Sequence, residues 1–195
     1  MFGYAGKILR INLTTREIVK DILPEKMCVE FIGGRGFVAK TLYEELPPGT
    51  HPFDENNLFI IATGPLSGHF LPASGKTHFG SKSPATGGYA DSNMGGHFGP
   101  ALKYAGYDMV VITGKAETPS FVFIEDDKID IRPAAAYWGG QNTGWACARI
   151  CSGNNQSPGA VCFPGLPGCH YRTITCQSSF HPPFWVNCII PEHLF

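Results

Sequence analysis

One glycine-rich stretch most limits the folds open to this chain of 195 residues. Residues 87–108 read GGYADSNMGGHFGPALKYAGYD and hold six glycines, which permit positive φ and close approach of the backbone to a ligand. They end a region, residues 73–99, of small and polar types with little regular period. A helix is expected over residues 100–105, since proline suits a first helical turn and Gly106 can end it. Three explanations stay open: a tight structural turn, a cradle for an anion, or the seat of a large cofactor.

Short apolar segments lie on both sides of this stretch, and most of them predict β-strands. The expected strands cover residues 8–13, 17–20, 58–62, 109–115 and 121–132, the last as a hairpin that turns at Asp126 and Asp127. Pro24 and Glu25 mark a helix start, and a second helix is expected over residues 37–46. The predicted fold class is therefore α+β, a β-rich domain with a few short helices.

The composition changes near Gly139 and Gly140. The last 55 residues hold six of the seven cysteines and six of the 16 prolines, but only three of the chain's 15 basic and 16 acidic residues. We expect a domain over residues 1–139 and an irregular Cys/Pro-rich tail, aberrant or disordered, over residues 140–195. A lost reading frame near residue 140 would explain this tail, and a real but divergent tail is the alternative. The cysteine spacing matches neither a zinc pair nor a cluster motif.

Charge and hydropathy exclude several classes of partner. A formal net charge of -1 gives no reason to expect nucleic acid or an anionic membrane as a partner. The first residues, MFGYAGKILRINL, lack the basic and apolar regions of a secretory signal. No apolar run approaches the roughly 18–20 residues that cross a bilayer. We expect a soluble, cytoplasmic protein.

Several side chains near the glycine-rich stretch could contact an anion or a metal ion. Asn93 offers a side-chain amide or a main-chain carbonyl to a cation such as Mg²⁺, and an ordinary turn asparagine is the alternative. Lys76 and Lys82 could neutralise a phosphate or remain solvated. For Arg35, bracing of the loop between two helices is preferred over contact with an anion. The spacing of three nearby histidines matches no metal motif, so they are given no chemistry: His69, His78 and His97.

Five segments occur together in the order of a known family. They read GKILRINLTT, FIGGRG, ATGPLSG, KSPATGGYADSNMGGHFGPALKYAGYD and VVITGKAETP. From about residue 2 to residue 139, the chain resembles the amino-terminal domain of the aldehyde ferredoxin oxidoreductase family, whose members use tungsten or sometimes molybdenum. The resemblance implies a β-rich base on which a bis-pterin cofactor sits, with Mg²⁺ held between the pterin phosphates.

The resemblance also implies roles for three residues. Asn93 would lend its main-chain carbonyl to the Mg²⁺ site, and Gly95 would contact the cofactor. Lys76 matches a basic residue that reaches the pterin and lies between it and the iron–sulfur cluster. The family member compared carries arginine there, and lysine keeps the charge without the planar, bidentate fork. No residue of this chain is expected to act as a catalytic acid or base.

By resemblance, the full-length enzymes oxidise an aldehyde with water to a carboxylic acid and pass electrons through a [4Fe–4S] cluster to ferredoxin. Their cluster cysteines, C-x2-C-x3-C plus a distant fourth, and a second, AGRGG-like pterin segment are not found in this sequence. The expected protein is thus a truncated oxidoreductase, inactive alone, that supplies one side of the cofactor site. A non-catalytic module completed by another polypeptide and an inert fragment are the alternatives. Two kinds of assembly stay open: a homodimer, or a complex with a subunit that completes the enzyme.

Overall fold

The computed structural model describes residues 2–135 and the backbone of residues 185–190. The chain divides into two compact units, one up to Lys115 and one from Ala116 onward. The expected boundary near residue 139 lies outside the described residues. Within them, no helix is long and apolar enough to cross a membrane.

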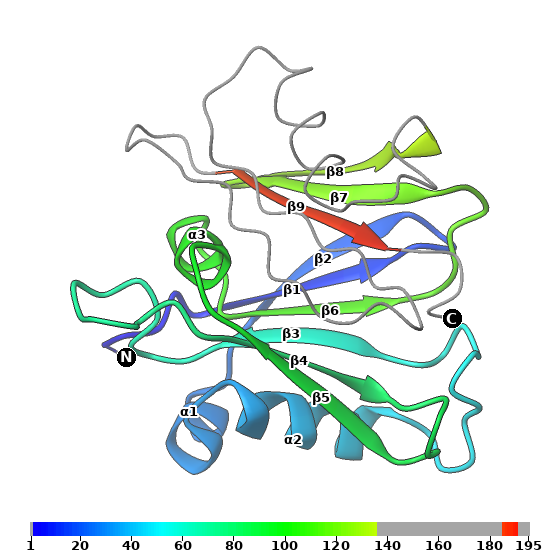
Figure 1. Ribbon diagram of the computed structural model, residues 1–195, viewed down its shortest axis with the longest axis horizontal. Helices are drawn as coiled ribbons and strands as arrows, with labels where there is room; N and C mark the ends of the chain where they lie inside the picture. The colour runs from blue at the N-terminus through cyan, green and yellow to red at the C-terminus, as the bar shows by residue number, and fades with distance from the viewer. Residues whose placement is uncertain (1, 136–184, 191–195) are drawn as a thin grey trace. The chain divides into compact units, whose positions relative to one another are not determined.

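The first unit is built on a six-stranded mixed sheet (Figure 1). Its strands are β1 (Lys7–Asn12), β2 (Glu17–Ile22), β3 (Phe59–Thr63), β4 (Thr77–Lys82), β5 (Tyr89–Met94) and β6 (Met109–Thr113). Their order across the sheet is β2-β1-β6-β3-β4-β5, so β2 and β5 are the two edges. Only β1 and β6 pair in parallel among these strands, and every other neighbouring pair is antiparallel.

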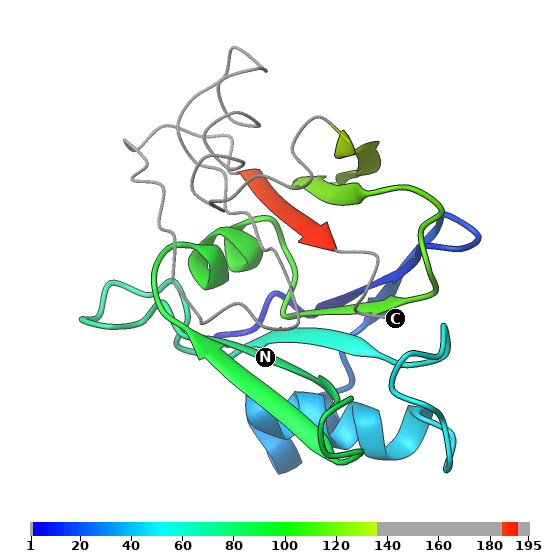
Figure 2. The same ribbon diagram turned by 45° about the vertical axis from the view of Figure 1, so that its right-hand side comes forward.

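Three short helices cover the two faces of this sheet. They are α1 (Glu25–Phe31), α2 (Arg35–Glu45) and α3 (Phe98–Tyr104). Helices α1 and α2 lie against one face and α3 lies against the other, as Figures 1 and 2 both show. Burial of apolar side chains between these layers supplies the main stabilisation of such a fold. The core on the α1–α2 face contains Ile8, Leu23, Cys28, Phe37, Val38, Leu42, Leu58, Ile60, Ala62, Met109 and Val111.

A glycine in β4 lets α2 approach the sheet. A Cβ atom at Gly80 would lie 2.4 Å from the Cγ1 atom of Val38 on α2. Any larger side chain at this position would force the helix away from the strand. Because side chains alternate along a strand, His78 lies on the same face of the sheet as Gly80. The register also pairs His78 with Asn93 of the edge strand β5.

The second unit contains a three-stranded antiparallel sheet. Its strands are β7 (Ser120–Glu125), β8 (Lys128–Pro133) and β9 (Trp185–Ile190), in the order β8-β7-β9. The β7–β8 hairpin turns at Asp126, which adopts a positive φ of 50°, and Asp127, as the sequence predicts. Strand β7 is buried from Ser120 to Ile124.

The α+β class with short helices is confirmed, but three strands were not predicted from the sequence. Strands β4 and β5 lie in the region expected to have little regular structure, because their alternating positions carry polar residues and glycine instead of an apolar series. Strand β9 lies in the tail, where no strand period was expected. Helix α3 begins at Phe98, two residues before the expected Pro100. The remaining predictions for the tail fall on residues 136–184 and 191–195 and lie outside the described structure.

Candidate functional site

A pocket of about 680 Å³ opens beside the ends of strands β3, β4 and β5. Residues of three segments form most of its wall: 32–35 between α1 and α2, 64–67 after β3, and 71–74 with 76–78 at the entry into β4. Ala62 of β3 and Asn93 of β5 complete the lining. The pocket is therefore assembled from loops at one end of these strands, and loops held on a rigid scaffold commonly carry binding residues.

The pocket lining has one apolar side and several polar groups. Arg35 and Lys76 supply positive charge, and the lining contains no carboxylate. The apolar part consists of Ile32, Pro65, Leu66, Leu71 and Pro72. Such a lining suits a ligand that combines an anionic group with a flat, weakly polar ring.

Close contacts between backbones hold the walls of the pocket together. A Cβ atom at Gly33 would lie 2.7 Å from the carbonyl oxygen of Thr63, and one at Gly75 would lie 2.1 Å from the carbonyl oxygen of Gly96. Real side chains cannot occupy either position without a shift of the backbone, so these glycines let neighbouring loops touch directly. The amide of Gly34 donates to the same Thr63 oxygen at 2.9 Å.

A polar network lies along the β4–β5 pair at one side of the pocket. The buried His78 ring places Nδ1 3.0 Å from Oδ1 of Asn93 and Nε2 2.8 Å from the hydroxyl of Tyr89. Asp91 forms an ion pair with Arg35 at the start of α2. Burial, and then the nearby Asp91 carboxylate, raise the pKa of Tyr89. This ion pair joins the start of α2 to β5, and bracing of the loop between α1 and α2 by Arg35 stays a prediction.

The three residues predicted to contact a cofactor lie at or near this pocket. Asn93 and Lys76 line it, whereas Gly95 directly follows β5 and is not part of the lining. A Cβ atom at Gly95 would have no atom within 4 Å, so the space beside it is open. The ammonium group of Lys82 does not line the pocket; it donates to the carbonyl of Thr50 at 2.7 Å.

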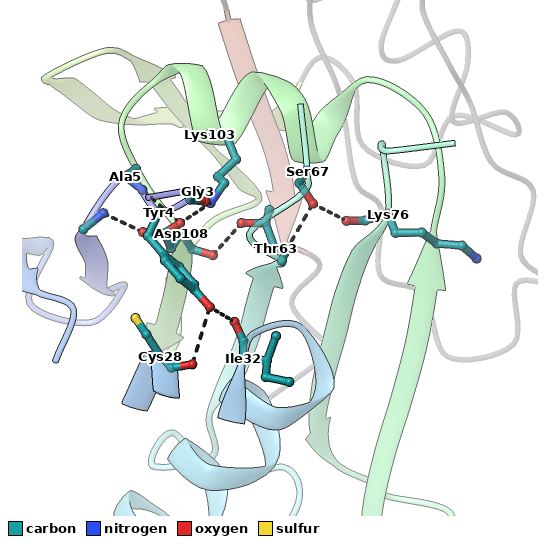
Figure 3. A network of polar contacts seen from close by, with 12 residues as sticks. Gly3, Tyr4, Ala5, Cys28, Ile32, Thr63, Ser67, Lys76, Lys103 and Asp108 are labelled. Atoms are coloured by element: carbon teal, nitrogen blue, oxygen red, sulfur yellow. Dashed lines mark hydrogen bonds and ion pairs between the residues drawn. The ribbon is translucent and has the colours of Figure 1, made fainter. Parts of the chain in front are cut away.

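Lys76 is fixed through its backbone. Its carbonyl oxygen accepts from the hydroxyl of Ser67 at 3.1 Å, and that hydroxyl oxygen also accepts from the amide of Gly64 at 3.2 Å. Figure 3 shows the Lys76 side chain extending away from this network. The ammonium group is therefore carried on an anchored backbone but remains exposed.

The described residues contain no cluster of three or more His, Cys, Asp or Glu side chains placed to hold a metal ion. The magnesium contact predicted at Asn93 uses a main-chain oxygen instead, and it stays a prediction. His78, Tyr89 and Asp91 were not predicted from the sequence as parts of the site. The alternation of Tyr89, Asp91 and Asn93 along YADSNM was the available signal, because it puts all three side chains on one face of a strand.

Comparisons with known proteins agree on one family. Residues 8–166 match the family model described as "Aldehyde ferredoxin oxidoreductase, N-terminal domain", which continues past the compositional change near residue 139. A tungsten-containing aldehyde ferredoxin oxidoreductase of Pyrococcus abyssi is 44% identical over 139 residues, which cover 71% of this chain and 23% of that protein. The aliphatic sulfonate oxidoreductase, WOR-like subunit, of Pyrococcus furiosus is 43% identical and is covered over 22% of its length.

The solved structures include one with the same fold and clear sequence similarity. It is the active site complex BamBC of benzoyl coenzyme A reductase in complex with 1,5-dienoyl-CoA. The match has a TM-score of 0.76 and 32% identity, and it covers 79% of this chain and 23% of that chain. The chain spans about a quarter of the length of the curated relatives that match 71% of it. It belongs to the aldehyde ferredoxin oxidoreductase family and matches the amino-terminal domain of that family.

Proposed function

We propose that this chain forms one side of a tungsten or molybdenum bis-pterin site in an aldehyde ferredoxin oxidoreductase. The observation that carries the proposal is the pocket of about 680 Å³, walled by glycine-rich backbone and basic side chains within the domain shared with tungsten-containing relatives. The reaction proposed for the complete enzyme is the oxidation of an aldehyde to a carboxylic acid, with ferredoxin as electron acceptor.

The pocket suits the two chemical parts of such a cofactor. The exposed Lys76 ammonium group favours the negative charge of a phosphate, whereas Arg35 is paired with Asp91 and the Gly34 amide with the carbonyl of Thr63. The apolar side chains of Ile32 and Leu66 suit the face of a ring. Gly33 projects no side chain from this part of the wall, because its backbone packs directly on the carbonyl of Thr63.

The residues predicted from the resemblance take distinct roles in this proposal. Asn93 offers its main-chain oxygen to Mg²⁺, and its side-chain oxygen is already engaged by His78. Gly95 allows the cofactor to approach the backbone, since a Cβ atom there would stand in open space. Lys76 provides a positive charge beside the pterin.

The bound cofactor would supply the redox chemistry, and the protein would bind and orient it. We assign no catalytic acid or base to the described residues. The [4Fe–4S] ligands, the substrate residues and the second pterin segment are assigned to sequence outside the region matched here, either in the same gene product or in a partner. On this proposal, the chain alone has no aldehyde oxidation activity and holds the cofactor weakly.

The test is to express the full chain in a host that makes the pterin cofactor, with tungstate or molybdate supplied. Pterin is measured by fluorescence after oxidation, and tungsten and molybdenum by mass spectrometry. We expect pterin at less than one per chain, and its loss in Lys76→Met. Lys26→Met, at a lysine whose side chain is 82% exposed on α1, is the matched control and should retain it. Pterin no higher than in an unrelated protein purified from the same host would overturn the proposal.

A second candidate is a non-catalytic cofactor-binding module that another polypeptide completes. The names of two similar proteins favour it, since one is a WOR-like subunit and the other is an active site complex. Affinity purification from the native cells would decide between the candidates. A co-purifying polypeptide with a C-x2-C-x3-C group supports the module, and recovery of the chain without such a protein argues against it.

A further inference from the structure

A strained turn stands at the wall of the pocket between α1 and α2. Ile32 has φ 63° and ψ -53°, and the amide of Gly33 donates to the carbonyl of Phe31 at 2.6 Å. This combination is a γ-turn with positive φ at its centre, which is a rare and strained form. A β-branched residue at positive φ costs on the order of 1–3 kcal/mol and is kept only where the surrounding structure enforces it.

The strain at Ile32 does not serve to bury its side chain. The residue is 64% exposed, and it lines the pocket beside Pro65 and Leu66. A glycine would make the same turn without strain, and the two following residues, Gly33 and Gly34, are glycines. What isoleucine adds at this position is an apolar side chain at the pocket.

The Tyr4 hydroxyl is hydrogen-bonded to this turn. It donates to the carbonyl oxygen of Ile32 at 2.6 Å (Figure 3). The Tyr4 ring stacks on Phe37 of α2 with 6.3 Å between centroids. The ammonium group of Lys103 lies 5.2 Å from the centroid of the same ring. Contacts from α2 and α3 therefore fix the position of the hydroxyl that restrains Ile32.

The segment that carries Tyr4 is itself anchored to a buried ion pair. Lys103 of α3 pairs with Asp108 and also donates to the carbonyl of Gly3 at 2.7 Å. The Asp108 carboxylate accepts from the amides of Ala5 at 3.2 Å and Gly6 at 2.6 Å. Figure 3 shows these groups converging behind the turn. The first residues of the chain thus form a brace between α3 and the pocket wall.

We propose that Ile32 is a ligand-contacting residue, that its side chain packs against the flat face of the pterin ring system, and that Tyr4 is the positioning residue that keeps it there. This inference rests on the proposed cofactor function. It adds an apolar contact to the cofactor site, whereas the contacts proposed at Lys76 and Asn93 are polar. It also assigns the first residues of the chain a role in ligand binding through Tyr4.

The positioning role is tested without any cofactor. In Tyr4→Phe, the amides of Gly33 and Gly34 should exchange with deuterium roughly fivefold faster, relative to the amide of Val111 in the middle of the sheet. Tyr43→Phe, at a tyrosine that is 89% exposed on α2, should leave the ratio unchanged. An unchanged ratio in Tyr4→Phe would overturn the positioning role.

The contact role is tested at Ile32 itself. Ile32→Gly removes both the side chain and the strain, so the unfolding free energy should be maintained or raised while pterin content falls roughly fivefold. Ile32→Ala should lower pterin content similarly. If the wild-type chain holds pterin and both variants retain it, the contact role is wrong while the proposed function stands. If the wild type holds no pterin, the proposed function fails and the contact role fails with it, while the exchange ratio still decides the role of Tyr4.

Discussion

The Nδ1 atom of His78 lies 3.0 Å from the Oδ1 atom of Asn93, across the antiparallel pair of β4 and β5. The sheet register therefore sets the orientation of a pocket side chain. With its side-chain oxygen engaged in this bond, Asn93 presents its amide NH₂ group and its main-chain oxygen to other partners. The buried histidine, which the sequence alone gave no chemistry, thus directs how Asn93 faces the pocket.

Replacement of His78 should change the orientation of the Asn93 side chain while the fold is kept. His78→Leu removes the ring contacts to both Asn93 and Tyr89, and we expect the unfolding free energy to fall by about 1–3 kcal/mol. The Asn93 side-chain amide resonances should shift in the nitrogen–proton NMR spectrum. His78→Asn keeps a donor near the position of Nδ1 and should restore most of the Asn93 signal. Equal spectra for the Leu and Asn variants would contradict this arrangement.

Substitution by alanine should lower the stability of the protein at one glycine of the site and leave it almost unchanged at another. Gly75→Ala places a Cβ atom 2.1 Å from the carbonyl of Gly96, so we expect a loss of about 1–3 kcal/mol in chemical unfolding. Gly95→Ala meets nothing within 4 Å and should leave stability within about 0.5 kcal/mol. Its pterin content should nevertheless fall, because the new methyl group stands where the cofactor is proposed to approach. Retained pterin in Gly95→Ala would count against the role given to Gly95.

The ion pair between Lys103 and Asp108 should be among the most sensitive positions of the first unit. Both side chains are buried, with 8% and 1% of their areas exposed. Lys103→Met leaves the carboxylate with only its two amide donors, and removal of one partner from a buried pair costs about 3–5 kcal/mol. Glu30→Gln, which breaks an exposed pair with Lys26, is the control and should change stability by about 0.5 kcal/mol or less. Urea unfolding of the three proteins measures the difference.

Stability should decrease at alkaline pH. Burial raises the pKa values of the Tyr4 and Tyr89 hydroxyls and of the Cys28 thiol. The unfolded chain therefore releases these protons first, at about pH 8.5–10, and the folded state loses stability as pH rises from there through the raised values. Below that range this stabilisation is fully present.

Urea unfolding at a series of pH values between 8 and 11 checks the alkaline slope. Tyr89→Phe should reduce the slope, and Tyr43→Phe, at an exposed tyrosine, serves as the control. A slope that is identical in all three proteins would show that Tyr89 makes no contribution.

The parts of the fold that follow an apolar period were predictable from sequence. Strands β1, β3 and β6 carry alternating or continuous apolar residues, and the β7–β8 hairpin carries its turn at two aspartates. Strand β4 could not be predicted in this way because it buries His78 for a polar network and Gly80 for the approach of α2. Strand β5 is an edge strand whose Tyr89, Asp91 and Asn93 are exposed or engaged with polar partners.

The candidate site was predictable only as far as local motifs reach. Asn93, Gly95 and Lys76 stand in the segments that carry the family resemblance, so sequence could single them out. Ile32 and Tyr4 were missed because their significance lies in a backbone angle and in a hydrogen bond across 28 positions of the chain. Neither the backbone angle nor the hydrogen bond produces a periodic pattern in the sequence.

The position of β6 at the middle of the sheet sets an order of assembly. It pairs with β1 on one side and β3 on the other, and it alone joins the β1–β2 hairpin to the β3–β4–β5 meander. A ribosome must therefore release residues up to Thr113 before the two halves can unite. Until then the early strands expose unpaired edges, which favour aggregation of the nascent chain. On the function proposed above, loading of the cofactor follows that step, because Asp108, which anchors the segment that positions Ile32, is the residue directly before β6.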